Sequence, residues 1–260
     1  MVRSTVHRAR RRFGQHFLEG AWVDKLIRAI DPQPDQTFIE IGPGRGALTR
    51  PLAARAKQVI AYEIDRDLAA ELRGTMPANV SVIEGDFLDA NPESRIPNPV
   101  RVAANLPYNV ASPIMFRLID WSRRGVPITD ATLMLQKEVA DRLLAKPGSK
   151  DYGVLTVLIG HRASVERVLS LPPGAFRPPP KVHSAVVRLR FHDPEPPVRD
   201  EAGFEDLVKR AFSQRRKTLG NALGGLTPQR CQSTLAPPID LRRRAETLSI
   251  AEFAVLSNNA

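Results

Sequence analysis

Apolar residues recur along the chain at two spacings, one typical of buried strands and the other typical of helices. Nearly continuous apolar runs predict short strands at 37–41, 58–63, 80–84, 100–104 and 131–136. Apolar positions three and four residues apart predict helices at 22–30, 47–56, 65–72, 112–121 and 137–145. Because strands and helices largely alternate, the pattern predicts an α/β fold built on a mostly parallel sheet.

The pattern changes beyond residue 150. The apolar run 154–159 fits either a helix or a strand, and we favour a helix because 164–169 then supplies a strand with an alternating pattern. Segment 184–191 alternates apolar and basic residues, which predicts a half-exposed final strand. The proline-rich segment 192–197 is a candidate boundary, dividing the chain into domains 1–191 and 192–260.

The remainder of the chain reads as helical, and basic residues gather in it. Helical spacing covers 204–212 and 250–256, and we also expect a helix at 241–247. Two basic clusters lie in this part of the chain: Arg215, Arg216 and Lys217, and Arg242, Arg243 and Arg244. A third basic segment, which includes Arg10, Arg11 and Arg12, lacks an apolar period and predicts an N-terminal arm.

The composition of the chain indicates which classes of protein it can belong to. The 260 residues are 42% hydrophobic, enough for a medium α/β domain with a small annex, and no apolar run approaches the roughly 20 residues of a membrane span. We therefore expect a cytoplasmic protein. The one cysteine excludes an intrachain disulfide, and the five histidines show no metal-ligand spacing, so we expect no metal. The formal charge of +10 favours a polyanionic partner.

Three polar features follow successive strands. The glycine turn 42–46 (GPGRG) comes after the first strand, Glu63 ends the second about 20 residues later, and Asp86 follows the third. This order is typical of nucleotide-binding folds, in which Gly42 and Gly44 let the backbone approach the ligand and Glu63 binds ribose hydroxyls. Three alternatives stay open: a plain tight turn, a helix N-terminal carboxylate at Glu63, and a turn aspartate at Asp86.

The sequence Asn105-Leu106-Pro107-Tyr108 ends the fourth strand, at the sheet edge where ligands bind in open α/β folds. The Asn105 side-chain oxygen and the Leu106 carbonyl can each accept one hydrogen of an aromatic amine, and Tyr108 can stack on the base. This set suits methylation of the exocyclic amine of adenine. Taken alone, four residues fit a simple strand-to-loop turn equally well.

Several motifs in one order resemble the small-subunit (16S) rRNA adenine dimethyltransferase family over nearly the full chain. They are 13–18 (FGQHFL), 40–49 (EIGPGRGALT), 105–109 (NLPYN), 134–139 (MLQKEV), 147–150 (PGSK), 152–153 (YG), 176–182 (FRPPPKV) and 212–219 (FSQRRKTL). Each motif is modest on its own, but the whole series in this order is specific.

The resemblance implies a class I, Rossmann-like methyltransferase domain with a mostly parallel seven-stranded sheet, a small all-α C-terminal domain and S-adenosyl-L-methionine as cofactor. It implies cofactor contacts at His16, Leu18, Gly42, Gly44, Glu63, Asp86 and Asn105. Many members have Asn at the position of His16. The catalytic motif falls on Asn105, Leu106, Pro107 and Tyr108, with Phe176 as a second stacking ring.

The substrate that the resemblance implies is a pair of adjacent adenosines in the 3′-terminal hairpin loop of small-subunit rRNA, dimethylated late in subunit biogenesis. We expect RNA contacts at Arg10, Arg11, Arg12, Lys146, Lys150, Arg215, Arg216 and Lys217, and a monomeric enzyme. Two alternatives share the core: an Erm-type large-subunit rRNA methyltransferase that confers antibiotic resistance, and a noncatalytic ribosome-assembly or transcription factor. An NAD-dependent dehydrogenase would be suggested by the glycine turn alone. The spacing of the glycines in this chain, G-x-G-x-G, differs from the G-x-G-x-x-G of dinucleotide-binding sites.

Overall fold

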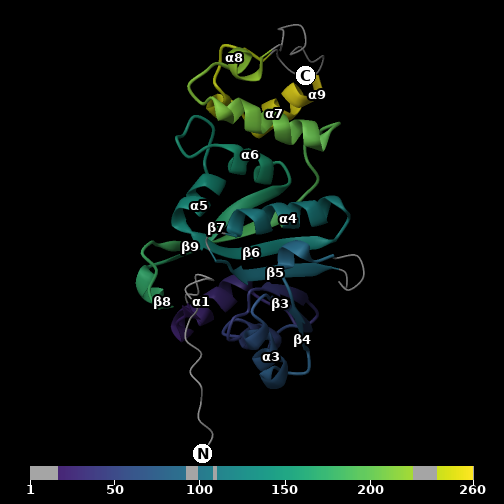
Figure 1. Ribbon diagram of the computed structural model, residues 1–260, viewed down its shortest axis with the longest axis vertical. Helices are drawn as coiled ribbons and strands as arrows, with labels where there is room; N and C mark the ends of the chain where they lie inside the picture. Colours follow the sequence, from purple (N-terminus) through teal and green to yellow (C-terminus); the bar gives the residue numbers. More distant parts are fainter. Residues whose placement is uncertain (1–16, 92–98, 108–109, 225–238, 260) are drawn as a thin grey trace, which may run out of the picture. The chain divides into compact units, whose positions relative to one another are not determined.

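The structure is a computed structural model that describes residues 17–91, 99–107, 110–224 and 239–259 (Figure 1). Five residues of the predicted site lie outside the described residues: Arg10, Arg11, Arg12, His16 and Tyr108. Within the part that is described, no helix is both long enough and apolar enough to span a membrane.

A seven-stranded sheet forms the centre of the fold, with the strand order β4-β3-β2-β5-β6-β9-β7. Its strands are β2 (Thr37–Ile41), β3 (Gln58–Glu63), β4 (Val80–Glu84), β5 (Val100–Asn105), β6 (Ile128–Gln136), β7 (Ala163–Leu171) and β9 (Ser184–Phe191). The pairs β2–β3, β3–β4, β2–β5 and β5–β6 are all parallel. The predicted mostly parallel α/β sheet is therefore confirmed. The order reverses at β2, which places a topological switch point between β2 and β5.

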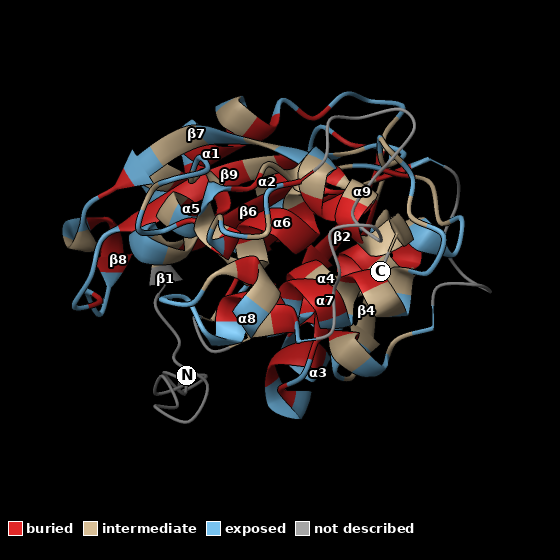
Figure 2. Cartoon of the chain, turned by 90° about the horizontal axis from the view of Figure 1, so that it is seen from above, coloured by how far each residue is buried: buried red, intermediate tan, exposed pale blue. Residues whose placement is uncertain are grey.

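Strand β9 runs against its neighbour β6. The Lys137 N–H at the end of β6 donates to the His183 carbonyl, 2.9 Å away, just before β9 begins. The prediction of a half-exposed final strand holds only for its second half, where Arg188 is half-buried and Arg190 is exposed. In the first half, Ser184 to Val187 are buried on both faces of the strand. The reason is position: β9 lies between β6 and β7, inside the sheet rather than at its edge. Figure 2 shows the buried centre of the sheet in red.

The helices are α1 (Gly20–Ile30), α2 (Thr49–Ala53), α3 (Arg66–Thr75), α4 (Ala111–Arg123), α5 (Lys137–Leu143), α6 (Val154–Gly160), α7 (Glu201–Ser213), α8 (Leu219–Leu223) and α9 (Ile250–Asn259). Short 3-10 turns are η2 (Phe87–Asp89), η4 (Pro173–Ala175) and η6 (Ala245–Thr247). The choice of a helix for 154–159 is confirmed by α6. A separate two-stranded sheet pairs β1 (Phe17–Leu18) with β8 (Phe176–Arg177) in antiparallel register.

Two predicted helices differ from the structure. Helix α2 is shorter than the predicted 47–56, because the glycine turn continues through Gly46 and Pro51 is tolerated only in a first helical turn. The predicted helix at 241–247 is wrong. There the Leu241 and Arg243 carbonyls accept hydrogen bonds from Gly220 and Leu219 of α8, so they are not used for helical bonds of their own.

The chain forms two compact units. The first contains the described residues up to Lys137 together with Arg167–Leu189, and the second contains Glu138–Glu166 together with the described residues from Arg190 onward. The helices α5 and α6 thus largely group with the C-terminal helices. A division of function at residue 191 stays a prediction.

In the first unit, α1 packs on one face of the sheet. Its apolar stripe of Val23, Leu26, Ile27 and Ile30 follows the helical spacing i, i+3, i+4, i+7. These side chains share one buried cluster with strand residues that include Phe38, Ala103, Met134 and Val186. The amphipathic pattern of the sequence therefore fixes which side of α1 meets the sheet.

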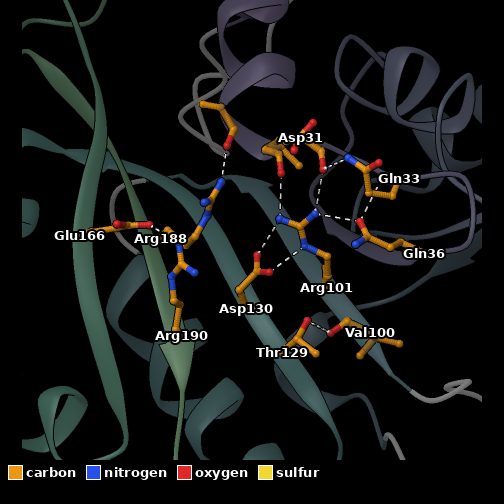
Figure 3. Close-up of polar contacts among 12 residues, drawn as sticks. Asp31, Gln33, Gln36, Val100, Arg101, Thr129, Asp130, Glu166, Arg188 and Arg190 are labelled. Carbon is orange, nitrogen blue, oxygen red and sulfur yellow. Dashed lines mark hydrogen bonds and ion pairs between the residues drawn. The ribbon is translucent and has the colours of Figure 1, made fainter.

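Two arginines of the sheet bind the C-terminal end of α1 through hydrogen bonds (Figure 3). Arg101 on β5 makes a bidentate pair with Asp130 on β6, at 2.7 and 3.2 Å. The same guanidinium donates to the Ile30 carbonyl at 2.8 Å and the Asp31 carbonyl at 3.1 Å. Arg188 on β9 donates to the Ala29 carbonyl. The carbonyls at a helix end lack helical partners, and these arginines supply them.

Arg101→Met is expected to lower the free energy of unfolding by about 3 kcal/mol, because it leaves Asp130 and the helix-end carbonyls without a partner. Arg101 and Asp130 are only 11% and 15% exposed, so water replaces the lost contacts poorly. The matched control is Arg73→Met, which breaks the pair with Glu84 at 46% and 39% exposure and should cost less than about 1 kcal/mol. Urea denaturation of both variants gives the comparison, and equal costs would contradict the anchoring role.

The second unit buries an uncharged histidine. The His161 ring lies 4.5 Å from the Phe204 ring, and neither ring nitrogen has a hydrogen-bond partner among the described residues. Burial lowers the pKa of His161, and Arg162 and His192 lower it further, while Glu201 opposes the shift. The folded unit therefore binds fewer protons at this site than the unfolded chain does.

The protein is expected to lose stability in mild acid because of His161. The pKa of His161 in the folded protein lies below the ordinary value of 6.5. Above pH 6.5 the buried neutral ring therefore costs no stability, and the free energy of unfolding falls as the pH drops below 6.5. His161→Leu should flatten the fall in melting temperature between pH 8 and pH 5, measured by scanning calorimetry. His183→Leu, at an exposed histidine, is the control and should leave the fall unchanged. An unaltered fall in His161→Leu would refute the assignment.

Candidate active site

Four strands of the first unit end nearly level at one edge of the sheet. Ile41 pairs in register with Tyr62 on β3 and Ala104 on β5, so the residues one step further, Gly42, Glu63 and Asn105, meet at the carboxyl edge. Asp86 follows β4 at the same edge, after Gly85. Because the strand order reverses between β2 and β5, this is the edge where open α/β folds bind ligands.

The glycine turn that follows β2 needs its glycines for two different reasons. Gly42, Gly44 and Gly46 have φ values of 70°, 58° and 76°, in the left-handed region that favours glycine. A Cβ on Gly46 would lie 2.7 Å from the Met76 side chain, so this glycine serves packing. A Cβ on Gly42 would meet open space. Gly42 is exposed, so a ligand can approach the backbone of this open turn, which we call the glycine cradle.

Glu63 holds the loops on both sides of its own strand. Its Oε2 accepts from the Gly44 N–H and its Oε1 from the Asp65 N–H, each at 2.9 Å, and its carbonyl accepts from the Gly85 N–H. Burial raises the pKa of Glu63, and the backbone hydrogen bonds oppose this. Asp65 rather than Glu63 caps α3, accepting from Asp67 and Leu68 N–H groups. Glu63 is thus a buried carboxylate aligned with the glycine turn.

A second buried acid lies under the glycine turn. Glu40 is 2% exposed, and its Oε2 has no hydrogen-bond partner among the described residues. Burial raises the pKa of Glu40 to about 8, the Thr49 hydroxyl opposes the rise, and the charge of Glu63 adds to it. Sequence reasoning missed this residue, although a carboxylate inside an apolar strand is a visible signal.

Asp86 is exposed, and aromatic packing fixes its position. Its Oδ1 accepts from the Leu88 N–H at 2.9 Å, which starts η2. The adjacent Phe87 ring is buried, edge-on to Tyr62 at 5.4 Å and tilted against Trp121 at 4.7 Å. The three rings join the end of β3, η2 and α4. Asp86 therefore presents its other oxygen from a fixed turn.

Ile64 is a further residue that sequence reasoning missed. It lies directly after Glu63 and is 53% exposed, one of two large apolar side chains in the described residues that stand out in this way. An apolar residue between two acids at a strand end was the available signal. Its position beside Glu63 suits contact with a flat, apolar ring face.

The catalytic motif is described only in part. Asn105 is half-buried at the end of β5, and the Leu106 N–H donates to the Met134 carbonyl at 3.3 Å, so the strand pairing continues into the motif. Phe176, the expected stacking ring, is 2% exposed and belongs to the apolar cluster beneath α1. Leu18 lies opposite Phe176 in the β1–β8 pair. The sheet edge thus gathers Gly42, Gly44, Glu63, Asp86 and Asn105, and Phe176 lies inside the core.

The described residues contain no group of three or more His, Cys, Asp or Glu side chains placed to bind a metal ion. The edge instead offers an open glycine cradle, two buried carboxyl groups and an unsatisfied oxygen. This donor set fits a polar organic cofactor with hydroxyl groups and positive charge.

Basic side chains gather in the second unit, where some form hydrogen bonds or ion pairs within the protein and others are exposed. Arg215 donates to the Lys150 and Tyr152 carbonyls, at 2.8 and 3.1 Å, and pairs with Glu246 at 3.4 Å. Similarly, Arg242 pairs with Asp240 and Arg243 with Glu252. Five other basic side chains near these segments are exposed: Lys146, Lys150, Arg216, Lys217 and Arg244. Arg215 therefore holds the loop that carries Lys146 and Lys150.

Comparisons with known proteins agree with this arrangement. The family model described as "Ribosomal RNA adenine dimethylase" matches residues 6–260. A "Ribosomal RNA small subunit methyltransferase A" of Laribacter hongkongensis is 44% identical over 97% of this chain and 96% of its own length. The protein of that name from Methylibium petroleiphilum is 45% identical over 96% of both chains.

Two solved structures share the architecture. A dimethyladenosine transferase from Plasmodium falciparum superposes with a TM-score of 0.75 at 28% identity, covering 93% of this chain and 96% of that one. The 23S rRNA methyltransferase ErmE gives a TM-score of 0.62 at 29% identity, covering 94% and 98%. The Erm group is thus a related branch that shares the fold.

The family's donor is S-adenosyl-L-methionine, and the cradle and carboxyl groups of the sheet edge fit it. The relatives at 44–45% identity are small-subunit enzymes, which favours that branch over the Erm branch and over a noncatalytic factor. The chain belongs to the ribosomal RNA adenine dimethylase family, as an S-adenosylmethionine-dependent enzyme that dimethylates adenines of ribosomal RNA.

Proposed function

We propose that the enzyme dimethylates two adjacent adenosines in the 3′-terminal hairpin loop of the small-subunit rRNA, late in assembly of the subunit. The observation that carries the site assignment is the placement of Asn105 at the switch-point edge, level with Glu63. We further propose that it works as a monomer in the cytoplasm, where its ribosomal substrate is assembled.

The chemistry requires an amine lone pair to be turned toward an electrophile. The exocyclic nitrogen of adenine is a poor nucleophile, because its lone pair is delocalised into the ring. The Asn105 side-chain oxygen and the Leu106 carbonyl accept its two hydrogens, which orients the lone pair. S-adenosyl-L-methionine, when bound, supplies a methyl group on a positively charged sulfur. Tyr108 and Phe176 remain proposed stacking partners, and Phe176 must expose a ring face to act as one.

The donor is held by the other residues of the same edge. Gly42 and Gly44 line the cradle, and Glu63 accepts from ribose hydroxyls with the lone pairs left free by its two backbone bonds. Asp86 accepts from the amine of the donor's adenine, and Ile64 packs on the face of that ring. His16 and Leu18 complete the proposed cofactor contacts.

The RNA is gripped by exposed basic side chains of the second unit and by the N-terminal residues Arg10, Arg11 and Arg12. Lys146, Lys150, Arg216 and Lys217 are exposed and contact the phosphate backbone, which positions RNA without reading its sequence. We propose that residues 1–191 carry catalysis, and that 192–260 carry RNA contact together with the 146–150 loop.

The decisive experiment is methyl transfer from labelled donor to purified ribosomal subunits that lack these modifications, with the methylated positions mapped. Label at two adjacent adenosines of the small subunit supports the proposal. Label in large-subunit rRNA would instead support the Erm-type alternative, and no label in either would support a noncatalytic factor.

Asn105→Ala is expected to reduce methyl transfer at least a thousandfold while the melting temperature stays near that of the wild type. The substitution removes the acceptor that orients the amine, and Asn105 is only half-buried at a strand end. Asn91→Ala, at an exposed asparagine of the same unit, is the control. Near-normal turnover in Asn105→Ala would overturn the catalytic assignment. Calorimetry of donor binding to the variant distinguishes a loss of catalysis from a loss of donor binding.

Glu63→Ala should weaken donor binding more than RNA binding. Two charge-assisted hydrogen bonds to ribose are lost, worth roughly 1.5–3 kcal/mol each at most. The variant also leaves the Gly44 and Asp65 N–H groups without their acceptor, so its melting temperature should fall. An unchanged donor dissociation constant in calorimetry would limit Glu63 to a structural role.

The double charge reversal Arg216→Glu and Lys217→Glu should weaken binding to small subunits and flatten its salt dependence, because fewer counterions are released. Arg215 is left intact, since it fastens the 146–152 loop. The control, Arg55→Glu with Lys57→Glu, makes the same change in net charge at exposed positions before β3. Equal weakening in both variants would show a general charge effect and no local grip.

A further inference from the structure

Glu40, Glu63 and Asn105 lie on one face of the sheet. Side chains alternate along a strand, and residues in register on parallel neighbours share a face. Glu40 pairs in register with Ala61 on β3 and Ala103 on β5. Two residues further along, those strands reach Glu63 and Asn105 on the same face. Glu40 therefore lies on the strand between them, two residues deeper in the sheet.

With Glu63 and Asn105 in their proposed roles, Glu40 lies beneath the reacting part of the donor. Glu63 and Asn105 are separated by two strand spacings, about 10 Å, with β2 between them. If Glu63 takes the ribose and Asn105 takes the acceptor amine, the sulfonium must lie between them, since its sulfur is bonded to the ribose 5′ carbon. The strand under that position is β2, and its acid is Glu40.

The surroundings of Glu40 offer it no compensating cation. Among the described residues it forms no ion pair, its in-register neighbours are alanines, and its Oε2 lacks a hydrogen-bond partner. The polar groups that face it are the Thr49 hydroxyl of α2 and the Glu63 carboxylate of β3. A second anion beside an unpaired buried acid favours its neutral form.

We propose that Glu40 is the counter-ion of the positively charged donor: a neutral acid in the free protein that loses its proton to solvent when the sulfonium binds. The proposal rests on the assignment of Glu63 and Asn105 under the proposed function. It has a consequence for turnover. The demethylated product carries a neutral thioether, so Glu40 favours the fresh donor over the spent one and takes its proton back after transfer.

The sign of the pH dependence follows from the free acid. Glu40 has a pKa of about 8 in the free protein, and an adjacent cation lowers it. Donor affinity should therefore rise about tenfold between pH 6 and pH 9, the equivalent of one pKa unit, whereas product affinity should not gain from Glu40.

Isothermal titration calorimetry of the full chain tests this directly. Titrations at pH 7 in buffers of different ionisation enthalpy count the protons released with S-adenosyl-L-methionine and with S-adenosyl-L-homocysteine. The α-amino groups of both ligands also titrate, near pH 8 for a typical amine, so the count must be compared with Glu40→Gln, which retains the ligand's own contribution. Glu71→Gln, at an exposed acid on α3, is the matched control.

The expected result is an excess of released protons for the donor over the product in the wild type and in Glu71→Gln, and no such excess in Glu40→Gln. That variant should also lose most of the pH-dependent preference for donor over product. Equal proton counts in wild type and Glu40→Gln would overturn the proposal. If Glu40→Gln does not fold, the wild-type comparison of the two ligands decides: equal proton release overturns the proposal, and an excess for the donor supports it. Failure of the wild type to bind either ligand would overturn the site assignment itself.

Discussion

The Glu63 carboxylate is the contact on which the active edge depends. One oxygen binds the glycine turn after β2, the other binds the start of α3, and the carbonyl of the same residue binds the turn after β4. Three loops are thereby hydrogen-bonded to one buried acid. A buried carboxylate is costly unless its oxygens are satisfied, and these backbone N–H groups satisfy them. The residue proposed to bind ribose therefore also shapes the cradle around the donor.

The two edges of the sheet are specialised. At the amino edge, Arg101 donates hydrogen bonds to Asp130, to Gln36 and to the last carbonyls of α1 (Figure 3). At the carboxyl edge, by contrast, Glu40 keeps an unsatisfied oxygen and Gly42 faces open space. The contacts of Arg101 stabilise the amino edge, whereas the carboxyl edge keeps an open turn and an unsatisfied oxygen where the donor is proposed to bind. Such a division is expected when a site must be ready for a charged ligand.

Basic residues of the second unit divide in a similar way. Arg215, Arg242 and Arg243 are engaged by carbonyls or carboxylates of their own unit, whereas Arg216 and Lys217 are exposed. The sequence shows three consecutive basic residues without distinguishing them. Arg215, the first residue of the cluster, donates to the carbonyls of a loop, and its neighbours are the ones proposed to contact phosphate. Net charge alone therefore overstates the number of side chains open to RNA.

The sequence alone determined the seven strands of the central sheet, most of the helices, the family and the motifs at the strand ends, because these depend on periodicity and on residues close in the chain. It also placed Gly42, Glu63 and Asn105 at one edge, since the ends of parallel strands meet there. Three conclusions required tertiary structure. The burial of β9 follows from its place inside the sheet, and the burial of Phe176 from its place under α1. The position of Glu40 between Glu63 and Asn105 follows from strand register. Local sequence does not specify this register, because the residues paired with Glu40, Ala61 and Ala103, lie 21 and 63 residues further along the chain.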